Sequence, residues 1–249
     1  MIRIEEINAV INDVKPLFSE LQNLYGRLPQ THCRCQQPGV CCAFLPEMTW
    51  VEALRWIGVI KGLPQAAMRE ILRKFVKFYL TTPIRHTGCP FLMDGRCGIY
   101  PYRSFACRAY GLWSQTTGDS RTRENRHSRQ ALLQLWEQFG LAVPAKMVTF
   151  EIDYCDQVDG AVEKPMSDDQ LMDILQQIYR LDQALPDLQT KFESEYHSDF
   201  SFLIASLVLG YRRAVLGKFA VIKELVRQGT EARLQQMLGK AKPDVLMAF

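Results

Sequence analysis

The sequence contains no apolar run long enough to cross a membrane. The longest, residues 200–211, is about half of the ~20 residues that a membrane-spanning helix needs, and Arg212 and Arg213 follow it within two positions. Residues 1–6 carry acidic side chains where a secretory signal has a basic start and an apolar core. We therefore expect no contact with a membrane and no export, and we predict a cytoplasmic location.

A large excess of charge of one sign is also missing. Thirty basic side chains stand against 27 acidic ones, which leaves a formal net charge of +3. One basic run occurs near a predicted helix start, but it has no interleaved aromatic residues; it consists of Arg121, Arg123, Arg126 and Arg129. A nucleic-acid partner is therefore not expected.

Several motifs of common enzymes are absent. The chain has no GxGxxG after a strand and no GxxxxGK[ST], so phosphate-cradling loops for nucleotides are unsupported. It also lacks GxSxG, HExxH and the CxxxCxxC typical of radical S-adenosylmethionine enzymes. Neither repeats nor low-complexity segments occur, and 47% hydrophobic with 23% charged residues is the balance of a core-forming protein.

Long alternating runs of β-branched residues are scarce, whereas apolar residues recur at three- and four-residue steps. This is the period of amphipathic helices, so the sequence predicts a mainly α protein with little β structure. Residues 81–118, rich in Gly, Pro and Cys, are predicted to form an ordered loop region with short helical pieces. The predicted helices cover residues 4–25 with a kink at Pro16, about 50–62, 64–80, 120–139, 167–185, 199–228 with a break near Gly210 or Gly217, and a short one from Thr230; residues 148–154 are predicted as a strand or an extended arm.

The cysteines suggest a division of the chain. We predict a cysteine-cluster metal-binding domain with an N-terminal helix over residues 1–160, and a helical C-terminal region over residues 161–249. The break is placed near residues 160–165, where the cysteines have ended. The two regions can also pack into one unit.

What the sequence does have is cysteine. Eight are present, and in a reducing compartment their clustering favours metal binding over disulfides. The thiols outnumber the four that a zinc ion or one iron–sulfur cluster requires. Cys155 stands alone, as either a buried side chain or an extra ligand, and His32 and His86 are candidate imidazole ligands. The first group is Cys33, Cys35, Cys41 and Cys42, on a loop turned by Pro38 and Gly39; the second is Cys89, Cys97 and Cys107.

The second group resembles a known string of residues. Over residues 30–110 the chain resembles the YkgJ-type cysteine-cluster family, whose domain is described as CxxCxxCC, zinc- or iron-chelating. The first group fits that family with a departure, because Pro38 stands where a cysteine is expected and Cys33 is the substitute; Ser104 likewise replaces a proline after Arg103. The matching residues of the second group are Cys89-Pro-Phe-Leu, Gly95-Arg-Cys97, Ile99-Tyr100, Arg103 and Cys107-Arg108.

The resemblance implies metal binding by the cysteines. Arg103 and Arg108 are the expected cofactor-binding residues, because cations offset the negative charge of thiolates. Zinc is saturated by four ligands, and the adjacent thiols of Cys41 and Cys42 do not easily reach one ion, whereas a cluster has separated irons. The expected cofactor is therefore an iron–sulfur cluster of the [4Fe-4S] type, with zinc as the alternative. The expected ligands are Cys33, Cys35, Cys41, Cys42, Cys89, Cys97 and Cys107.

Three functions remain open at this point. The first is an iron–sulfur protein that acts in redox chemistry or as a cluster-dependent modifying enzyme. The second is a zinc-stapled module that binds a protein partner, and the third is a metal-delivery protein. The family's domain also resembles the cysteine-rich part of flagellin lysine N-methylases, which adds methyl transfer as a possibility. Neither a substrate nor a partner follows from the sequence.

Overall fold

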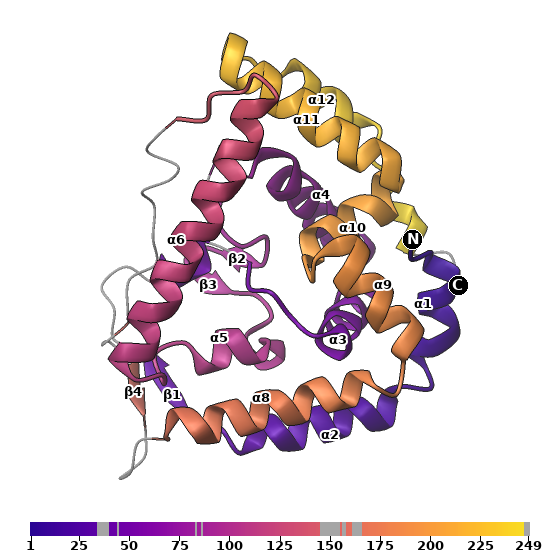
Figure 1. Ribbon diagram of the computed structural model, residues 1–249. Helices are drawn as coiled ribbons and strands as arrows, with labels where there is room; N and C mark the ends of the chain where they lie inside the picture. The colour runs from indigo at the N-terminus through magenta and orange to yellow at the C-terminus, as the bar shows by residue number, and fades with distance from the viewer. Residues whose placement is uncertain are drawn as a thin grey trace.

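The structure is a computed structural model that describes residues 1–33, 40–43, 45–82, 84–85, 87–144, 155, 158–160 and 166–246. It is mainly helical, which confirms the predicted fold class (Figure 1). The helices are α1 (Ile4–Ile11), α2 (Lys15–Gly26), η1 (Val40–Ala43), α3 (Trp50–Lys61), α4 (Gln65–Thr81), η2 (Tyr100–Tyr102), α5 (Phe105–Ala109), α6 (Gln115–Gln138), α8 (Asp168–Asp182), α9 (Pro186–Tyr196), α10 (Phe200–Leu209), α11 (Tyr211–Gln228), α12 (Ala232–Gly239) and η3 (Pro243–Leu246); the strands are β1 (Thr31–Cys33), β2 (Leu92–Met93), β3 (Arg96–Cys97) and β4 (Val158–Gly160).

The first predicted helix is divided in two. A turn over residues 12–14 separates α1 from α2, and Pro16 lies in the first turn of α2. Proline suits that position because its missing N–H has no helical partner there. The prediction of one kinked helix was therefore wrong, because the chain forms two helices here and Pro16 lies at the start of the second.

The start of α3 is as predicted. Thr49 and Glu52 form a capping box, and the helix ends at Gly62. A second carboxylate, which the sequence does not indicate, reinforces this start: Asp182 at the end of α8 accepts the backbone N–H groups of Trp50 at 2.8 Å and Val51 at 2.7 Å. The start of α3 is thus bound to the C-terminal half of the chain.

The long apolar region after Asp199 breaks at one of the two predicted glycines. Gly210 adopts a positive φ of 86° between α10 and α11, which bend by 109° there. Gly217 lies inside α11 instead, where a Cβ would stand 2.3 Å from Cε of Met237. No single described helix is long and apolar enough to cross a membrane; only α10 and α11 taken together, across that bend, reach such a length and composition.

The described strands form two antiparallel pairs. In the first, β1 pairs with β4, and Cys33 lies opposite Val158. In the second, β2 and β3 form a hairpin in which Leu92 lies opposite Cys97. These short strands agree with the expectation of little β structure.

Two buried clusters hold the helices together. In one, α1, α3 and α4 pack with α9, α10 and α11; in the other, α2 and α5 pack with α8. Figure 1 shows α2 and α8 side by side at one edge of the molecule, and α6 running along another. Helices from both sides of residue 160 thus share both clusters. The break predicted at 160–165 and the extended segment predicted at 148–154 lie almost entirely outside the described residues.

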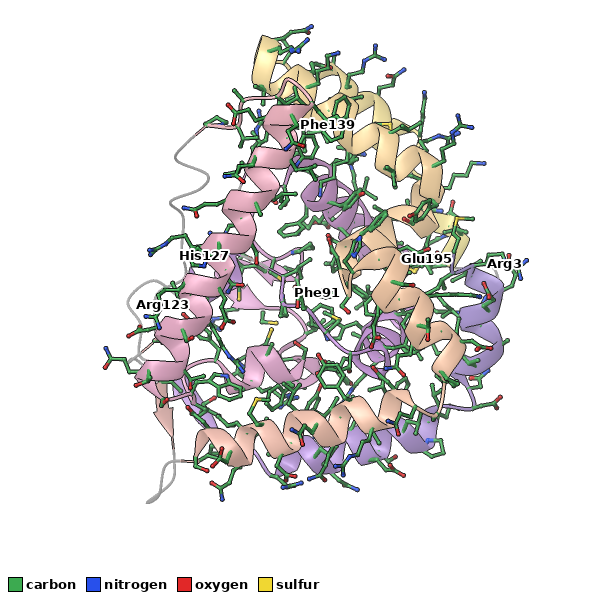
Figure 2. The ribbon with its side chains drawn as sticks, in the orientation of Figure 1. Arg3, Phe91, Arg123, His127, Phe139 and Glu195 are labelled. Atoms are coloured by element: carbon green, nitrogen blue, oxygen red, sulfur yellow. The ribbon has the colours of Figure 1, made fainter. Side chains whose placement is uncertain are left out.

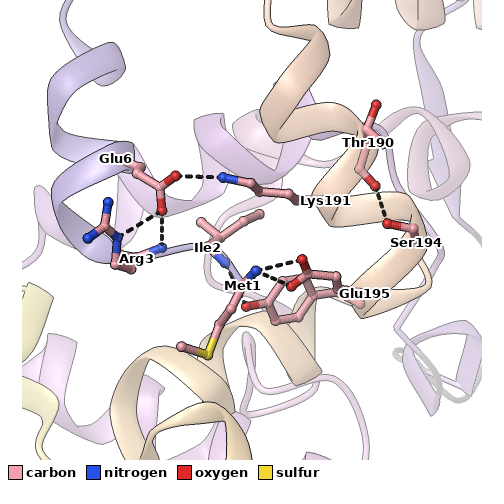
Figure 3. Close-up of polar contacts among 9 residues, drawn as sticks. Met1, Ile2, Arg3, Glu6, Thr190, Lys191, Ser194 and Glu195 are labelled. Carbon is pink, nitrogen blue, oxygen red and sulfur yellow. Dashed lines mark hydrogen bonds and ion pairs between the residues drawn. The ribbon is translucent and has the colours of Figure 1, made fainter.

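The N-terminal residues pack against α9 (Figure 3). Tyr196 accepts the backbone N–H of Ile2 at 3.1 Å, and the amino group of Met1 pairs with Glu195. Lys191 donates to Glu6 at 2.7 Å, which lowers the pKa of Glu6 to about 2. Ion pairs and hydrogen bonds, as well as packing, therefore hold α9 against α1 and the residues before it.

Candidate metal centre

The two cysteine groups meet through the backbone. Helix η1 carries Cys41, which is exposed, and Cys42, which is partly buried. The carbonyl oxygen of Cys42 accepts the backbone N–H of Cys89 at 2.5 Å. The described part of the first group is therefore held against the start of the second.

The hairpin β2–β3 positions the next two thiols. Cys89 precedes it and Cys97 lies in its second strand, while Asp94 and Gly95 form the two-residue turn with φ of 49° and 74°. Positive φ at both positions is typical of a tight hairpin, and an Asp-Gly pair adopts it readily. The Asp-Gly pair in the sequence thus explains the hairpin, although the sequence analysis treated it as loop.

Phe91 anchors this hairpin in the protein core. Its ring is 1% exposed and packs edge-on against Trp56 at 5.0 Å and Phe75 at 5.1 Å between ring centroids. Figure 2 shows Phe91 near the middle of the molecule. Burying an aromatic side chain of this kind contributes on the order of 2 kcal/mol, so the thiols on either side of Phe91 have a rigid support.

Helix α5 brings in Cys107, and Glu52 of α3 holds the helix start. Oε1 of the buried Glu52 accepts the backbone N–H of Phe105 at 2.6 Å and the hydroxyl of Tyr25 at 2.5 Å. Its Oε2 accepts the N–H and hydroxyl of Thr49. Glu52 therefore joins α2, α3 and the cysteine-bearing α5 at one point.

Five thiols are close enough to act on one another. Pairwise charge interactions and one hydrogen bond connect Cys41, Cys42, Cys89, Cys97 and Cys107, so that each takes part in a pair with at least two of the others. A negative charge on one of these thiols therefore penalises a second charge nearby. A bound cation would relieve this repulsion.

This environment gives the five thiols different pKa values. The hydrogen bond from Cys42 lowers the pKa of Cys41 to about 6, and the same bond raises the pKa of Cys42. Burial raises the pKa of Cys89 to about 12 and of Cys107 to about 11, and it also raises the pKa of Cys97. Without a cation, Cys41 is the thiol that ionises first.

Backbone N–H groups also point at two of the sulfurs. Phe91 and Leu92 donate to Cys89, and Ile99 donates to Cys97, and these bonds lower the pKa of the two thiols against the effect of burial. Hydrogen bonds of this kind favour thiolates and help to set the potential of a thiolate-bound cluster.

Arg103 is the cation among these thiols. Its charge lowers the pKa of Cys41, Cys97 and Cys107. The guanidinium lies 3.8 Å from the ring centroid of Tyr100, and its buried Nε has no hydrogen-bond partner among the described residues. Nε is therefore a donor that remains available to a sulfide or an anionic ligand.

Arg108, the other predicted cofactor-binding residue, interacts with the charge of Cys107, but its hydrogen bonds go to the backbone. It donates to the carbonyl oxygens of Arg103 at 2.8 Å and Pro101 at 2.5 Å, and it lies 4.5 Å from the ring centroid of Tyr25. These contacts hold the segment before α5 in place. Contact of Arg108 with a cofactor stays a prediction.

The remaining predicted ligands are placed only in part. The backbone of Cys33 lies in β1, but its side chain and that of His32 are not described, and Cys35 and His86 lie outside the described residues. Because β1 pairs with β4, Cys33 lies opposite Val158, three positions after the partly buried Cys155. The fold therefore brings the backbone of Cys155 near the first cysteine group.

The basic run of α6 lies apart from the thiols. Arg123 and His127 are exposed on the outer face of α6 (Figure 2). Arg121 instead stacks on Trp113, with its guanidinium 3.6 Å from the ring centroid. Arg123 is thus exposed to solvent, whereas Arg121 packs on an aromatic ring.

The described thiols do not form a preassembled site for a single ion. Across the part of the chain that the structure describes, no three His, Cys, Asp or Glu side chains are arranged so that they could hold one metal ion. The donor set nevertheless suits a thiolate-bound group, because five thiols, N–H donors to sulfur and one arginine are gathered in one region. Comparison of the chain with protein-family models, with curated proteins and with solved structures finds no significant match.

Two residues of this region were missed by the sequence analysis. The sequence places Glu52 only within the helix predicted over about residues 50–62, and its bond to Phe105 joins residues 53 positions apart. Phe91 was noted only as part of the family string. Nothing in the sequence indicates the contacts of Glu52 with α5, whereas an apolar residue two positions after Cys89 was a usable signal for an anchor.

Proposed function

We propose that the protein binds an iron–sulfur cluster and acts in redox chemistry or as a cluster-dependent modifying enzyme. The observation that carries the proposal is the mutual interaction of Cys41, Cys42, Cys89, Cys97 and Cys107, three of which also feel the charge of Arg103. When bound, the cluster would supply one-electron transfer or a Lewis-acidic iron.

The residues around the cluster would have different roles. Thiolates from η1, the β2–β3 hairpin and α5 would bind the irons, and Cys33 and Cys35 are further candidate ligands. Arg103 would offset the charge of the thiolates, while the N–H groups of Phe91, Leu92 and Ile99 would stabilise them. Glu52 would position α5 without touching the cluster.

A cluster fits this donor set better than a single zinc ion does. A structural zinc site needs four ligands around one point, and the described thiols do not converge in that way. The irons of a cluster are separated, so thiolates from different segments can reach different corners. The adjacency of Cys41 and Cys42 favours the same choice.

The test is to purify the full chain without oxygen and to measure its visible absorption with its iron, sulfide and zinc content. We expect a brown protein with matched iron and sulfide. Cys89→Ser and Cys107→Ser should lose most of the iron and the colour, whereas Met93→Ser, an exposed change on the same hairpin, should keep both.

A colourless protein with about one zinc per chain would overturn the proposal and leave the zinc-stapled module. Ready transfer of the metal to a chelator would instead favour a metal-delivery protein. Loss of iron in Met93→Ser as well would mean that the cysteine variants act by unfolding.

A further inference from the structure

A second site lies at the C-terminal end of α6. There a cavity of about 300 Å³ opens between α6, α4, α9, α10 and α11, and its lining is mostly apolar. Figure 2 shows Phe139 at this end of α6, away from Phe91 and the hairpin that carry the thiols. Its lining includes Tyr79, Trp136, Phe139, Phe202, Lys218 and Phe219.

Aromatic rings form the walls of this cavity. Trp136 stacks on Phe219 with centroids 5.8 Å apart and an angle of 13°, and Phe139 meets Phe219 edge-on at 6.0 Å. Tyr79 and Phe202, which also line the cavity, stack with centroids 5.0 Å apart and an angle of 3°. A preformed aromatic cavity of this size suits a small flat molecule.

A lysine side chain lines the cavity beside these rings. Lys218 of α11 is partly buried, and its Nζ lies 4.3 Å from the ring centroid of Tyr79. Burial lowers the pKa of Lys218, in keeping with its place beside the aromatic rings. Within the described residues no hydrogen bond or ion pair of Lys218 is found, so its ammonium is available to a ligand that enters the cavity.

The nearest acidic group does not neutralise this cation directly. Asp199 lines the same cavity and acts on Lys218 through its charge alone. Its Oδ1 accepts the N–H and hydroxyl of Ser201 and the N–H of Phe202, which cap the start of α10. Asp199 therefore caps α10 through Oδ1.

We propose that this cavity binds a small aromatic anion, with its carboxylate on Lys218 and its rings between the aromatic walls. A charge-assisted bond would join the carboxylate to the ammonium in a mostly apolar surrounding. A cationic ligand is disfavoured because it would meet Lys218, which already lies at the Tyr79 ring. The site does not use the thiols, so the inference is independent of the proposed cluster.

The test compares three probes of one shape with the full-length protein by isothermal titration calorimetry. They are 2-naphthoate, 2-naphthylmethanol and 2-naphthylmethylammonium, which carry negative, neutral and positive charge. We expect 2-naphthoate to bind at least about tenfold more tightly than the alcohol, because the charged hydrogen bond is made only by the anion. The ammonium probe should bind most weakly.

The variant Lys218→Met keeps the apolar length of the side chain but removes its charge. It should lower the affinity for 2-naphthoate to that of the alcohol and leave the alcohol unchanged. Lys223→Met, an exposed change on the same helix outside the cavity, should keep the preference.

Two results would overturn the proposal. One is equal binding of the anion and the alcohol, or no binding of the anion, to the wild-type protein; this comparison needs no variant to fold. The other is a folded Lys218→Met protein that still prefers 2-naphthoate.

Discussion

The carbonyl oxygen of Cys42 accepts the backbone N–H of Cys89 at 2.5 Å. This bond joins the two cysteine groups, which are separated in sequence by the whole of α3 and α4. Because α3 and α4 belong to the largest buried cluster, the relative position of the two groups depends on the core. The geometry of the candidate centre is therefore a property of the fold rather than of a local loop.

Glu52 gives the first prediction. Glu52→Ala removes the acceptor of four donors, two of them buried backbone N–H groups, and should lower the free energy of unfolding by about 3 kcal/mol. Tyr25→Phe removes one of these donors and should cost only about 1 kcal/mol. Urea denaturation of both variants measures the difference. Equal losses of unfolding free energy in Glu52→Ala and Tyr25→Phe would show that Glu52 does not hold α5.

Asp182 gives a prediction about pH. Burial raises its pKa from 3.8 to about 7, so between these values the folded state holds a proton that the unfolded state releases. The contribution of Asp182 to stability should thus decrease as pH rises from about 4 to 7, by at most about 4 kcal/mol. It should be constant above that range.

The measurement is the difference in unfolding free energy between the wild-type protein and Asp182→Ala over this pH range. Removal of the side chain leaves the N–H groups of Trp50 and Val51 without their acceptor, so the variant should be less stable at pH 5 by a few kcal/mol. Asp187→Ala, an exposed change nearby, is the control. A difference that grows with pH would contradict the assignment.

Glu6 should show the opposite pH dependence. The hydrogen bond from Lys191 lowers its pKa from 4.5 to about 2, so its contribution is present above pH 4.5 and is lost as pH falls toward 2. Because both side chains are partly exposed, Lys191→Met should cost no more than about 1 kcal/mol at pH 7. Thermal unfolding at pH 7 and pH 3 tests this, and a larger loss at pH 3 would argue against the pair in Figure 3.

The two arginines beside the thiols should behave differently. Under the proposed function, Arg103→Leu removes a cation next to the cluster and should shift its reduction potential to more negative values by on the order of tens of millivolts. Arg108→Leu removes bonds to two carbonyl oxygens and should mainly reduce stability. Redox titration and urea denaturation separate the effects. Equal potentials in the wild-type protein and Arg103→Leu would exclude a role for Arg103.

The helices were largely predictable because their signals are local. The capping boxes at Thr49 and Ser167 and the break at Gly210 follow from residues a few positions apart. Helix α9 was missed, although Pro186 stands in its first turn, where proline often begins a helix. The fold class therefore followed from the sequence, while one helix start was overlooked.

The candidate site was predictable only in its residue types. The clustering of cysteines identified the thiols, and the family resemblance identified Arg103 as a cation beside them. The bonds from Glu52 to Phe105 and from Asp182 to Trp50 join distant segments, and a local pattern carries no information about such pairs. The aromatic cavity around Lys218 was missed for the same reason, since its walls come from five helices.

Native mass spectrometry of the wild-type protein, purified without oxygen, tests the central claim most directly. The proposed function predicts a folded species whose mass exceeds that of the chain by matched numbers of iron and sulfide, and the loss of this increment in Cys89→Ser. A species with the mass of the chain alone, or of the chain with a single zinc ion, would contradict it.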